Sequence, residues 1–512
     1  MQYVMAAFSQ ENRRETRRYV CIFDDYGSVR QVSTRILKPY PVFVFHLTTT
    51  QTSKEASIDI DKQTMNRGIN DFSEGPVWKR IVIQAVPLTI AQLVHLLYNV
   101  VDRIYIGHIG DEGNIALTGV GLTFPIVTLI MGFAAWFGVG GVPLFSIARG
   151  ENNKEKAGRI LGNSLTILLI SSVVITVFGY VFQRPILFAF GASEVSYEYA
   201  SAYLNIYLLG TIFSMITTGM NGYINAQGFP RIGMLSIVIG AIVNIIFDPV
   251  FIFIFNMGVS GAALATVISQ GLSAVWVMMF ICGKQVVVPF SIRNMILDRN
   301  VVSDIVKLGT SNFMMQGTNC AVQIVCNATL QQYGGDLFVG IMTVVNSIRE
   351  IFMLPITGII GGSQPVISYN YGAKKYERVK QGISFNTWCC TIYTIIAWVS
   401  VYLLSKELFS IFSEDSHLIE TGIEMLRIYF FGFVFMALQF SGQSTFQALG
   451  DAKHAIFFSM LRKIIIVVPL TIILPVAGFG VNGVFVAEPV SNVIGGTACY
   501  LTMRITIKKK IS

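Results

Sequence analysis

Long apolar runs, almost free of charged residues, recur along the chain between Ile81 and Met503. A membrane-spanning helix needs about 20 mostly apolar residues. Twelve windows of this kind can be counted, near residues 81–106, 117–141, 159–182, 200–224, 232–254, 258–281, 306–330, 338–362, 381–404, 424–447, 464–478 and 481–503. The pattern predicts an all-α polytopic membrane protein with twelve transmembrane helices.

The two halves of this pattern repeat each other. When the sequence is compared with itself at an offset of 222 positions, similar residues coincide across six spans without a gap. The matched pairs include Pro143 with Pro365, Gly150 with Gly372, Tyr207 with Tyr429, Gly210 with Gly432, Gly228 with Gly450 and Gly258 with Gly480. Because six is even, both halves have the same orientation, and a pseudo-two-fold axis along the membrane normal would relate them. The prediction is two six-helix bundles that enclose a central cavity.

The same pattern divides the chain into four parts. Residues 1–64 form a polar N-terminal extension, 65–282 an N-lobe with spans one to six, 283–302 a cytoplasmic linker, and 303–512 a C-lobe with spans seven to twelve. Residues 65–80 resemble a complete short N-terminus that leads directly into the first span. We therefore expect translation to begin at Met65, which the intact mass of the native protein would test. The alternative is a disordered cytoplasmic extension.

Composition and charge agree with a membrane protein. Hydrophobic residues make up 53% of the chain and charged residues 13%, against roughly 25% charged in soluble proteins. The net charge of +8 does not indicate nucleic-acid binding, because the basic residues lie in short loops and tails. The loops after spans two, six and eight and the C-terminal tail are rich in Lys and Arg, whereas the alternate loops are poor in them. This asymmetry predicts that both termini are cytoplasmic in a cell-membrane protein.

Several function classes find no support in the sequence. The seven cysteines contain no CxxC pair and lie mostly in apolar spans, so neither a disulfide framework nor a zinc site is expected. We find no nucleotide-binding loop, no GxSxG nucleophile elbow and no HExxH. We therefore expect no enzymatic activity and no cofactor beyond a coupling ion, and energy for any active transport would come from an ion gradient.

The fifth span carries the least expected residue, a carboxylate inside an apolar helix, in the stretch Asn244-Ile-Ile-Phe-Asp248-Pro249. Such a carboxylate costs about 2.5–3.5 kcal/mol on insertion scales, so it usually faces the protein interior and marks an ion or proton path. Asn244 lies one turn away on the same face. Pro249 lacks an amide hydrogen and would bend the helix beside the acid, so we expect it to act as a hinge.

Helix geometry brings two further residues to the depth of Asp248. At 1.5 Å per residue, Asp102 lies about 6–8 Å from the outer end of span one, Asp248 about 9 Å and Thr266 of span six about 12 Å. Asp102, Asn244, Asp248 and Thr266 could then form an oxygen-rich site for Na⁺, or an acid pair sharing a proton, since two close carboxylates cannot both ionise cheaply. The alternative is that Asp102 caps or snorkels with Arg103 and Asp248 satisfies a neighbouring helix.

The second half lacks this acid pair. At the 222-residue offset Asp102 and Asp248 correspond to apolar residues, while Thr266 corresponds to Glu488. Glu488 is either part of a second site or a satisfied carboxylate that packs helices beside Pro489. Arg349 and Glu350 near mid-membrane either join an interior ion-pair network or line the cavity, and Glu350 is a second candidate for the second site.

Amide side chains follow helical spacing on two spans of the second half. They are Asn312, Gln316, Asn319 and Gln323 on span seven, and Gln439 and Gln443 on span ten. Such faces avoid lipid, so they either line a cavity suited to amphipathic cargo or form interhelical hydrogen bonds. On span one, His95 shares a face with Asp102. It could relay protons, but a packed core histidine is the favoured interpretation.

Three motifs and the repeat resemble the multidrug and toxic compound extrusion (MATE) transporters, in their DinF/MepA-like branch. The motifs are Tyr98-Asn-Val-Val-Asp102-Arg-Ile-Tyr-Ile-Gly107, Asn244–Pro249 and Gln364-Pro-Val-Ile-Ser-Tyr369-Asn-Tyr-Gly-Ala373, and the resemblance covers about residues 65–505. It implies an N-lobe cation site at Asp102, Asn244, Asp248 and Thr266. The C-lobe acids of some other branches are absent at equivalent places. The resemblance also implies export of cationic or amphipathic compounds in exchange for H⁺ or Na⁺.

The resulting hypothesis is a monomeric antiporter that works by alternating access. Its partners would be small organic cations or amphipathic compounds and the lipid bilayer. The alternative is a flippase for lipid-linked oligosaccharides, which should have a strongly cationic cavity for a pyrophosphate. The sequence disfavours it, because Arg103 and Arg349 are the only cations predicted inside the spans. Neither the interfacial acid–base cluster of an enzyme nor the filter ring of a channel is visible.

Overall fold

The computed structural model describes residues 5–12, 15–23, 29–33, 71–109, 113–412 and 415–510, and chain contacts divide it into two units, Met1–Thr64 and Met65–Ser512. In the first unit, β1 (Met5–Asn12), β2 (Glu15–Phe23) and β3 (Val29–Ser33) form an antiparallel sheet in the order β1-β2-β3. Met65, the predicted translation start, lies outside the described residues. In the second unit, the described residues form helices and their connections only.

The helices of the second unit fall into two sets, one for each half of the sequence. The first contains α2 (Val77–Gly107), α3 (Gly113–Phe137), η2 (Val139–Gly141), α4 (Val142–Gly150), α5 (Lys154–Ala189), α6 (Glu194–Leu209), α7 (Thr211–Ala226), α8 (Pro230–Pro249), η3 (Val250–Ile254) and α9 (Gly258–Ile281). A short η4 (Ile292–Met295) follows. The second contains α10 (Arg299–Gly372), α11 (Tyr376–Leu403), α12 (Ser405–Ser410), α13 (Ser416–Phe430), α14 (Phe433–Ala448), α15 (Ala452–Met460), η5 (Leu461–Val467), α16 (Val468–Leu474), η6 (Pro475–Phe479) and α17 (Gly480–Lys510).

These helices account for the twelve predicted spans. Among the described residues, eight helical segments are long and apolar enough to cross a membrane, and two bent pairs, α6 with α7 and α13 with α14, raise the number to ten. Two of the eight segments are double length. The 74-residue α10 breaks at Gly335, and the 59-residue segment Ala452–Lys510 breaks at Gly478 and Gly480, so each supplies two spans. The all-α, twelve-span architecture is confirmed.

The internal repeat is visible in the backbone. Left-handed turns recur 222 residues apart, at Gly228 (φ 92°) and Gly450 (φ 71°), and again at Gly258 (φ 55°) and Gly480 (φ 54°). The bends of spans four and ten also correspond, because they lie next to Gly210 and Gly432. Glycine suits such positions because it has no Cβ to oppose a positive φ. The sequence repeat is therefore a repeat of structure.

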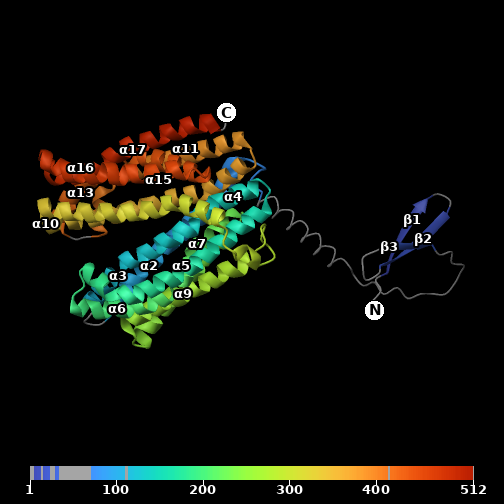
Figure 1. The fold of residues 1–512 in the computed structure, drawn as a ribbon, viewed down its shortest axis with the longest axis horizontal. Helices are drawn as coiled ribbons and strands as arrows, with labels where there is room; N and C mark the ends of the chain where they lie inside the picture. The colour runs from blue at the N-terminus through green and yellow to red at the C-terminus, as the bar shows by residue number, and fades with distance from the viewer. Residues whose placement is uncertain are drawn as a thin grey trace. The chain divides into compact units, whose positions relative to one another are not determined.

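Each half has its own hydrophobic core, as expected for two bundles related by a pseudo-two-fold axis. One cluster of buried residues runs from Ile106 to Ile305, and the two principal C-lobe clusters lie between Val322 and Ile507. Figure 1 shows the blue-to-green helices α2–α9 gathered in one bundle and the yellow-to-red α10–α17 in the other. α2 and α10 pack against each other across the boundary between the bundles.

The linker and the start of span eleven differ from the predictions. The linker after α9 is not only a polar connection, because Asn163 of α5 donates to the carbonyl oxygens of Asn294 and Ile296, 3.1 and 3.2 Å away. The helix of span eleven begins at Ala452, well before the predicted residue 464. A window of apolar residues excludes Arg462 and Lys463, although the structure places both inside this helical span.

Candidate functional site

The N-lobe polar site brings together the four residues predicted from three spans. Asn244 Nδ2 donates to Asp248 Oδ1 at 3.0 Å and lies 3.4 Å from Thr266 Oγ1. The carboxyl groups of Asp102 and Asp248 are close neighbours. Asp248 is fully buried and Asn244 is 1% exposed. The structure therefore brings α2, α8 and α9 together at the four predicted residues.

The local structure of α8 explains how the site is presented. Asn244 and Asp248 are four residues apart and so lie on one face. Regular α-helix ends at Pro249, and the segment Val250–Ile254 continues as a π-helix. Proline cannot donate to the preceding turn, and single π-turns are frequent at functional sites. The predicted hinge thus coincides with a change of helix type directly after Asp248.

Three oxygen atoms of this site have no hydrogen-bond donor among the described residues: Asp102 Oδ1, Asn244 Oδ1 and Asp248 Oδ2. A buried acceptor without a donor costs about 1–3 kcal/mol, which a water, a bound cation or, on a carboxyl group, a proton would relieve. Carboxylate, amide and hydroxyl oxygens are the ligands that hard cations prefer. The donor set therefore fits either a proton shared by the two carboxyl groups or a small cation such as Na⁺.

The alternative explanation for Asp102 was pairing with its neighbour Arg103. The Arg103 guanidinium instead lies over the ring of Phe124, 4.6 Å from the ring centroid. His95 is exposed rather than packed in a core, so the favoured interpretation of His95 is wrong. Asn99 Nδ2 lies 3.1 Å from His95 Nδ1 on the same helix. A proton-relay role for His95 stays a prediction.

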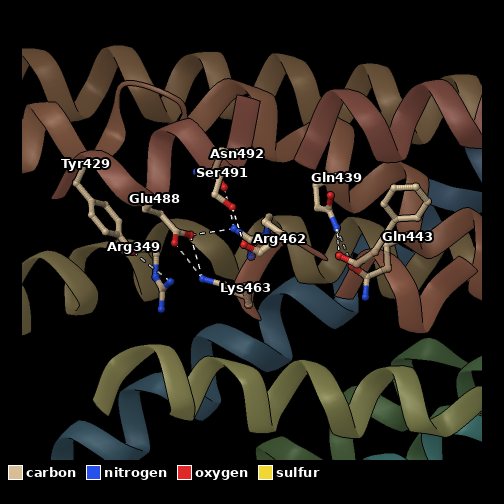
Figure 2. Close-up of polar contacts among 10 residues, drawn as sticks. Arg349, Tyr429, Gln439, Gln443, Arg462, Lys463, Glu488, Ser491 and Asn492 are labelled. Atoms are coloured by element: carbon tan, nitrogen blue, oxygen red, sulfur yellow. Dashed lines mark hydrogen bonds and ion pairs between the residues drawn. The ribbon is translucent and has the colours of Figure 1, made fainter. Parts of the chain in front are cut away.

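In the C-lobe, Glu488 is a satisfied carboxylate whose partners the sequence analysis missed. Glu488 Oε1 accepts hydrogen bonds from Arg462 Nη1 at 2.9 Å and from Lys463 Nζ at 3.0 Å. All three residues are buried, with exposed fractions of 4% for Glu488, 8% for Arg462 and 3% for Lys463. Arg462 also donates to Asn492 Oδ1 at 2.7 Å, and Figure 2 shows the two cations around the Glu488 carboxylate.

These two residues correct the predicted number of cations inside the spans. The predicted spans contain only Arg103 and Arg349 as cations, because Arg462 and Lys463 lie just before the apolar window of span eleven. A carboxylate buried in a bilayer needs a partner, so Glu488 itself was the signal that could have revealed them. The argument that the spans hold too few cations for an anionic cargo is therefore wrong.

A cavity of about 760 Å³ lies between the lobes. The N-lobe wall is mostly apolar and comes largely from α3, with Phe124, Pro125 and Leu129. The C-lobe wall has apolar side chains as well, but it carries all the charged and amide groups of the lining: Gln316, Asn319, Gln323, Asn346, Arg349, Glu350, Lys463 and Glu488. One apolar and one polar wall suit an amphipathic molecule. Of the two roles predicted for Arg349 and Glu350, the structure places both on the cavity wall.

The other predicted amides form hydrogen bonds between or along helices. Asn312 Oδ1 accepts from Gln447 Nε2 at 2.8 Å. Gln439 Nε2 donates to Gln443 Oε1 and to the Phe458 carbonyl oxygen, both at 3.2 Å. Half of the predicted lining set, Gln316, Asn319 and Gln323, therefore faces the cavity, whereas Asn312, Gln439 and Gln443 are not among the residues that line it.

An aromatic plug separates the cavity from the side of the basic loops. Trp136 of α3 stacks on Phe313 of α10 with ring centroids 4.4 Å apart, and Trp136 Nε1 donates to the Val306 carbonyl oxygen at 3.1 Å. Phe313 itself lines the cavity; the other cavity residues of these two helices lie before Trp136 on α3 and after Phe313 on α10. The lobes also meet closely where Gly309 lies against the Trp136 carbonyl. The structure is thus closed toward the basic-loop side.

We expect Gly309→Ala to open this closed end. A Cβ atom at position 309 would overlap the Trp136 carbonyl oxygen, a backbone atom that cannot move without separating α3 from α10. The cavity cysteine Cys320, kept as the only cysteine, would then react with a membrane-impermeant maleimide from the basic-loop side. Gly317→Ala on the same helix is the matched control, since its Cβ meets nothing within 4 Å. Equal labelling of both variants would contradict this assignment.

The segment before α2 reinforces the closure of this side. Arg378 of α11 donates to the carbonyl oxygens of Gly75, Phe72 and Glu74 at 2.8, 2.9 and 3.2 Å. Tyr369 OH donates to Asp71 Oδ1 at 3.2 Å. The segment that leads into the N-lobe is thereby attached to the ends of α10 and α11 through backbone carbonyls, a contact that no sequence pattern predicts.

Comparisons with known proteins agree with this architecture. The MatE family model matches residues 87–250 and 313–473, once in each half and together more than half of the chain. The multidrug export protein MepA of Staphylococcus saprophyticus is 25% identical over 443 residues, covering 86% of this chain and 97% of its own. MepA of Staphylococcus aureus strain MSSA476 is 25% identical over 413 residues, covering 81% of this chain and 90% of its own.

Solved structures show the same fold. A crystal structure of MATE in the straight conformation superposes with a TM-score of 0.81 at 24% identity, covering 86% of this chain and 98% of its own. An outward-facing multidrug resistance MATE family transporter of the MOP superfamily gives a TM-score of 0.80 at 24% identity, with the same coverage of both chains. With its two matched halves, its two six-helix bundles and the cavity between them, the chain belongs to the MatE family of membrane transporters.

Proposed function

We propose that this transporter exports cationic or amphipathic organic compounds in exchange for H⁺ or Na⁺. The observation that carries the proposal is the neighbouring carboxyl groups of Asp102 and Asp248, which with Asn244 present three buried oxygens that accept no hydrogen bond within the described part of the chain. An intramembrane carboxylate in this state is a binding place for a coupling cation. The names of the MepA relatives support the export of more than one compound.

The arrangement of α2 supplies a physical link between ion and cargo. Asp102 lies on α2, which packs against α8 at the ion site and against α10 along the lobe boundary. Uptake of a cation reduces the negative charge of the acid pair. The bend of α8 at Pro249 that has the lowest free energy then differs between the ion-bound and the ion-free site. A change in α8 passes to α2, and so to the packing between the lobes, which is the basis of alternating access.

The electrical contribution depends on stoichiometry. One charge moving down 100 mV releases about 2.3 kcal/mol. Exchange of one H⁺ or Na⁺ against one monovalent organic cation moves no net charge, so only the concentration gradients would drive it. In this proposal the protein is a monomer in the cell membrane, with both termini cytoplasmic and export directed away from the basic loops.

Efflux from proteoliposomes under separately imposed gradients tests the proposal. Vesicles loaded with ethidium would receive either a pH gradient or a Na⁺ gradient, with ionophores that dissipate each gradient as controls. We expect one of the two gradients to accelerate ethidium movement and its ionophore to remove the effect. If the rate of ethidium movement is the same with and without each gradient, ion-coupled antiport is refuted.

A further inference from the structure

We propose that the C-lobe wall of the cavity binds an anionic group, a carboxylate or sulfonate, through Arg349 and Lys463. The cargo would then include anionic and zwitterionic amphiphiles in addition to cations. This inference rests on the proposed function only in taking the cavity as the place where cargo binds. It is a separate site from the acid pair in the N-lobe.

The charges of the wall do not balance. Three cations, Arg349, Arg462 and Lys463, surround one carboxylate, Glu488 (Figure 2). Glu350 also lines the cavity but is exposed and forms no ion pair within 4.0 Å among the described residues. With Glu350 included, these five side chains carry a net charge of +1, although Arg462 lies behind the cavity wall rather than on it. Unbalanced charge away from water is costly. An anionic group on the cargo would reduce that cost.

Arg349 has unused hydrogen-bonding capacity. A guanidinium has five N–H donors, and the one side-chain hydrogen bond recorded for Arg349 among the described residues goes to Tyr429 OH at 3.3 Å. By contrast, Arg462 is 8% exposed, is held by Glu488 and Asn492, and is not among the cavity-lining residues. Planar guanidinium groups bind carboxylates in a bidentate manner. Arg349 is therefore the primary anchor and Lys463 a second positive charge beside it.

The remaining walls fit the apolar part of such a molecule. Phe124 and Leu129 of α3 face the cavity opposite the charged wall, and Gln316 and Asn319 offer neutral hydrogen-bonding groups between them. An amphiphile could place its apolar body against α3 and its anionic end against Arg349. A purely cationic ligand would meet repulsion at that end and attraction from the exposed Glu350.

Binding of three probes that share one fluorophore tests the inference. They are dansyl-6-aminohexanoic acid, its methyl ester and dansylcadaverine, measured by fluorescence anisotropy with the protein in nanodiscs of neutral lipid. We expect the wild type to bind the acid more tightly than the ester. Arg349→Gln should weaken binding of the acid about tenfold, as for loss of one hydrogen bond to a charged group, without changing the ester.

Two variants separate an anion site from a structural role. Tyr429→Phe keeps the guanidinium and removes its recorded hydrogen bond, so the acid should bind at least as tightly as in the wild type. Lys307→Gln removes an exposed cation on the same helix, outside the cavity, and should change nothing. Arg349→Lys should restore part of the affinity lost in Arg349→Gln.

Each failure has a distinct meaning. Equal binding of acid and ester by the wild type, equal weakening of both by Arg349→Gln, or no binding of any probe would overturn the anion site. Selective binding of the acid without gradient-driven ethidium efflux would leave the anion site standing and refute the proposed antiport. Gradient-driven ethidium efflux without selective binding of the acid would support the proposed antiport and overturn the anion site.

Discussion

Asp248→Asn is expected to abolish gradient-driven efflux while leaving a folded protein. The amide is close in size to the carboxyl group, and its oxygen can still accept the hydrogen bond from Asn244. It can neither take up a proton at this site nor offer a negative charge to Na⁺. The expected rate in proteoliposomes is that of empty vesicles, and size-exclusion chromatography in detergent checks the fold.

A carboxylate away from the site provides the control for this experiment. Asp336 lies beside the break in α10 at Gly335 and accepts a hydrogen bond from Gln331. Asp336→Asn removes one carboxylate without touching the acid pair, so efflux should match the wild type. Undiminished efflux in Asp248→Asn would refute the assignment of the coupling site.

Glu488→Gln is expected to destabilise the C-lobe. The substitution leaves Arg462 and Lys463 buried without their counter-charge, and removal of one partner from a buried ion pair costs about 3–5 kcal/mol. A thermal-unfolding experiment in detergent should show a lower midpoint and a lower yield of monodisperse protein. Glu350→Gln, at an exposed carboxylate on the wall of the same cavity, should unfold close to the wild type.

A double substitution tests the cause of that loss. Lys463→Met combined with Glu488→Gln removes one of the two orphaned cations and leaves Arg462 with Asn492. We expect this variant to recover part of the stability lost in the single one. If Glu488→Gln unfolds like the wild type, the ion pairs are not what holds α17 against η5.

The sequence allowed the spans, the repeat and the depth of the N-lobe site to be predicted, for simple physical reasons. A bilayer fixes the length of an apolar helix, and a constant rise per residue converts position into depth. Asp102, Asp248 and Thr266 therefore had to lie near one level if their helices were neighbours. The repeated left-handed turns, such as those at Gly228 and Gly450, follow from glycines conserved in register between the halves.

Other features could not be predicted because they depend on what lies opposite a residue. Helical spacing placed six amides on polar faces but could not show that Gln316 meets the cavity and Gln439 meets a carbonyl oxygen. Lys463 lies just outside the predicted span 464–478 because hydropathy penalises a cation, whereas in the structure Glu488 compensates for it inside the span. Such pairs are invisible until two distant helices are placed together.

The central claim is that cargo export is coupled to ion uptake at the Asp102 and Asp248 site. The most direct test reverses the efflux experiment and measures whether a gradient of cargo drives movement of the ion. In proteoliposomes without any ion gradient, an imposed ethidium gradient should move H⁺ or Na⁺ in the opposite direction, followed with an internal pH dye or Na⁺ indicator. The account predicts this countermovement for the wild type and its absence for Asp248→Asn. Ethidium that crosses through the wild type with no ion movement, or equal ion movement in the variant, would contradict it.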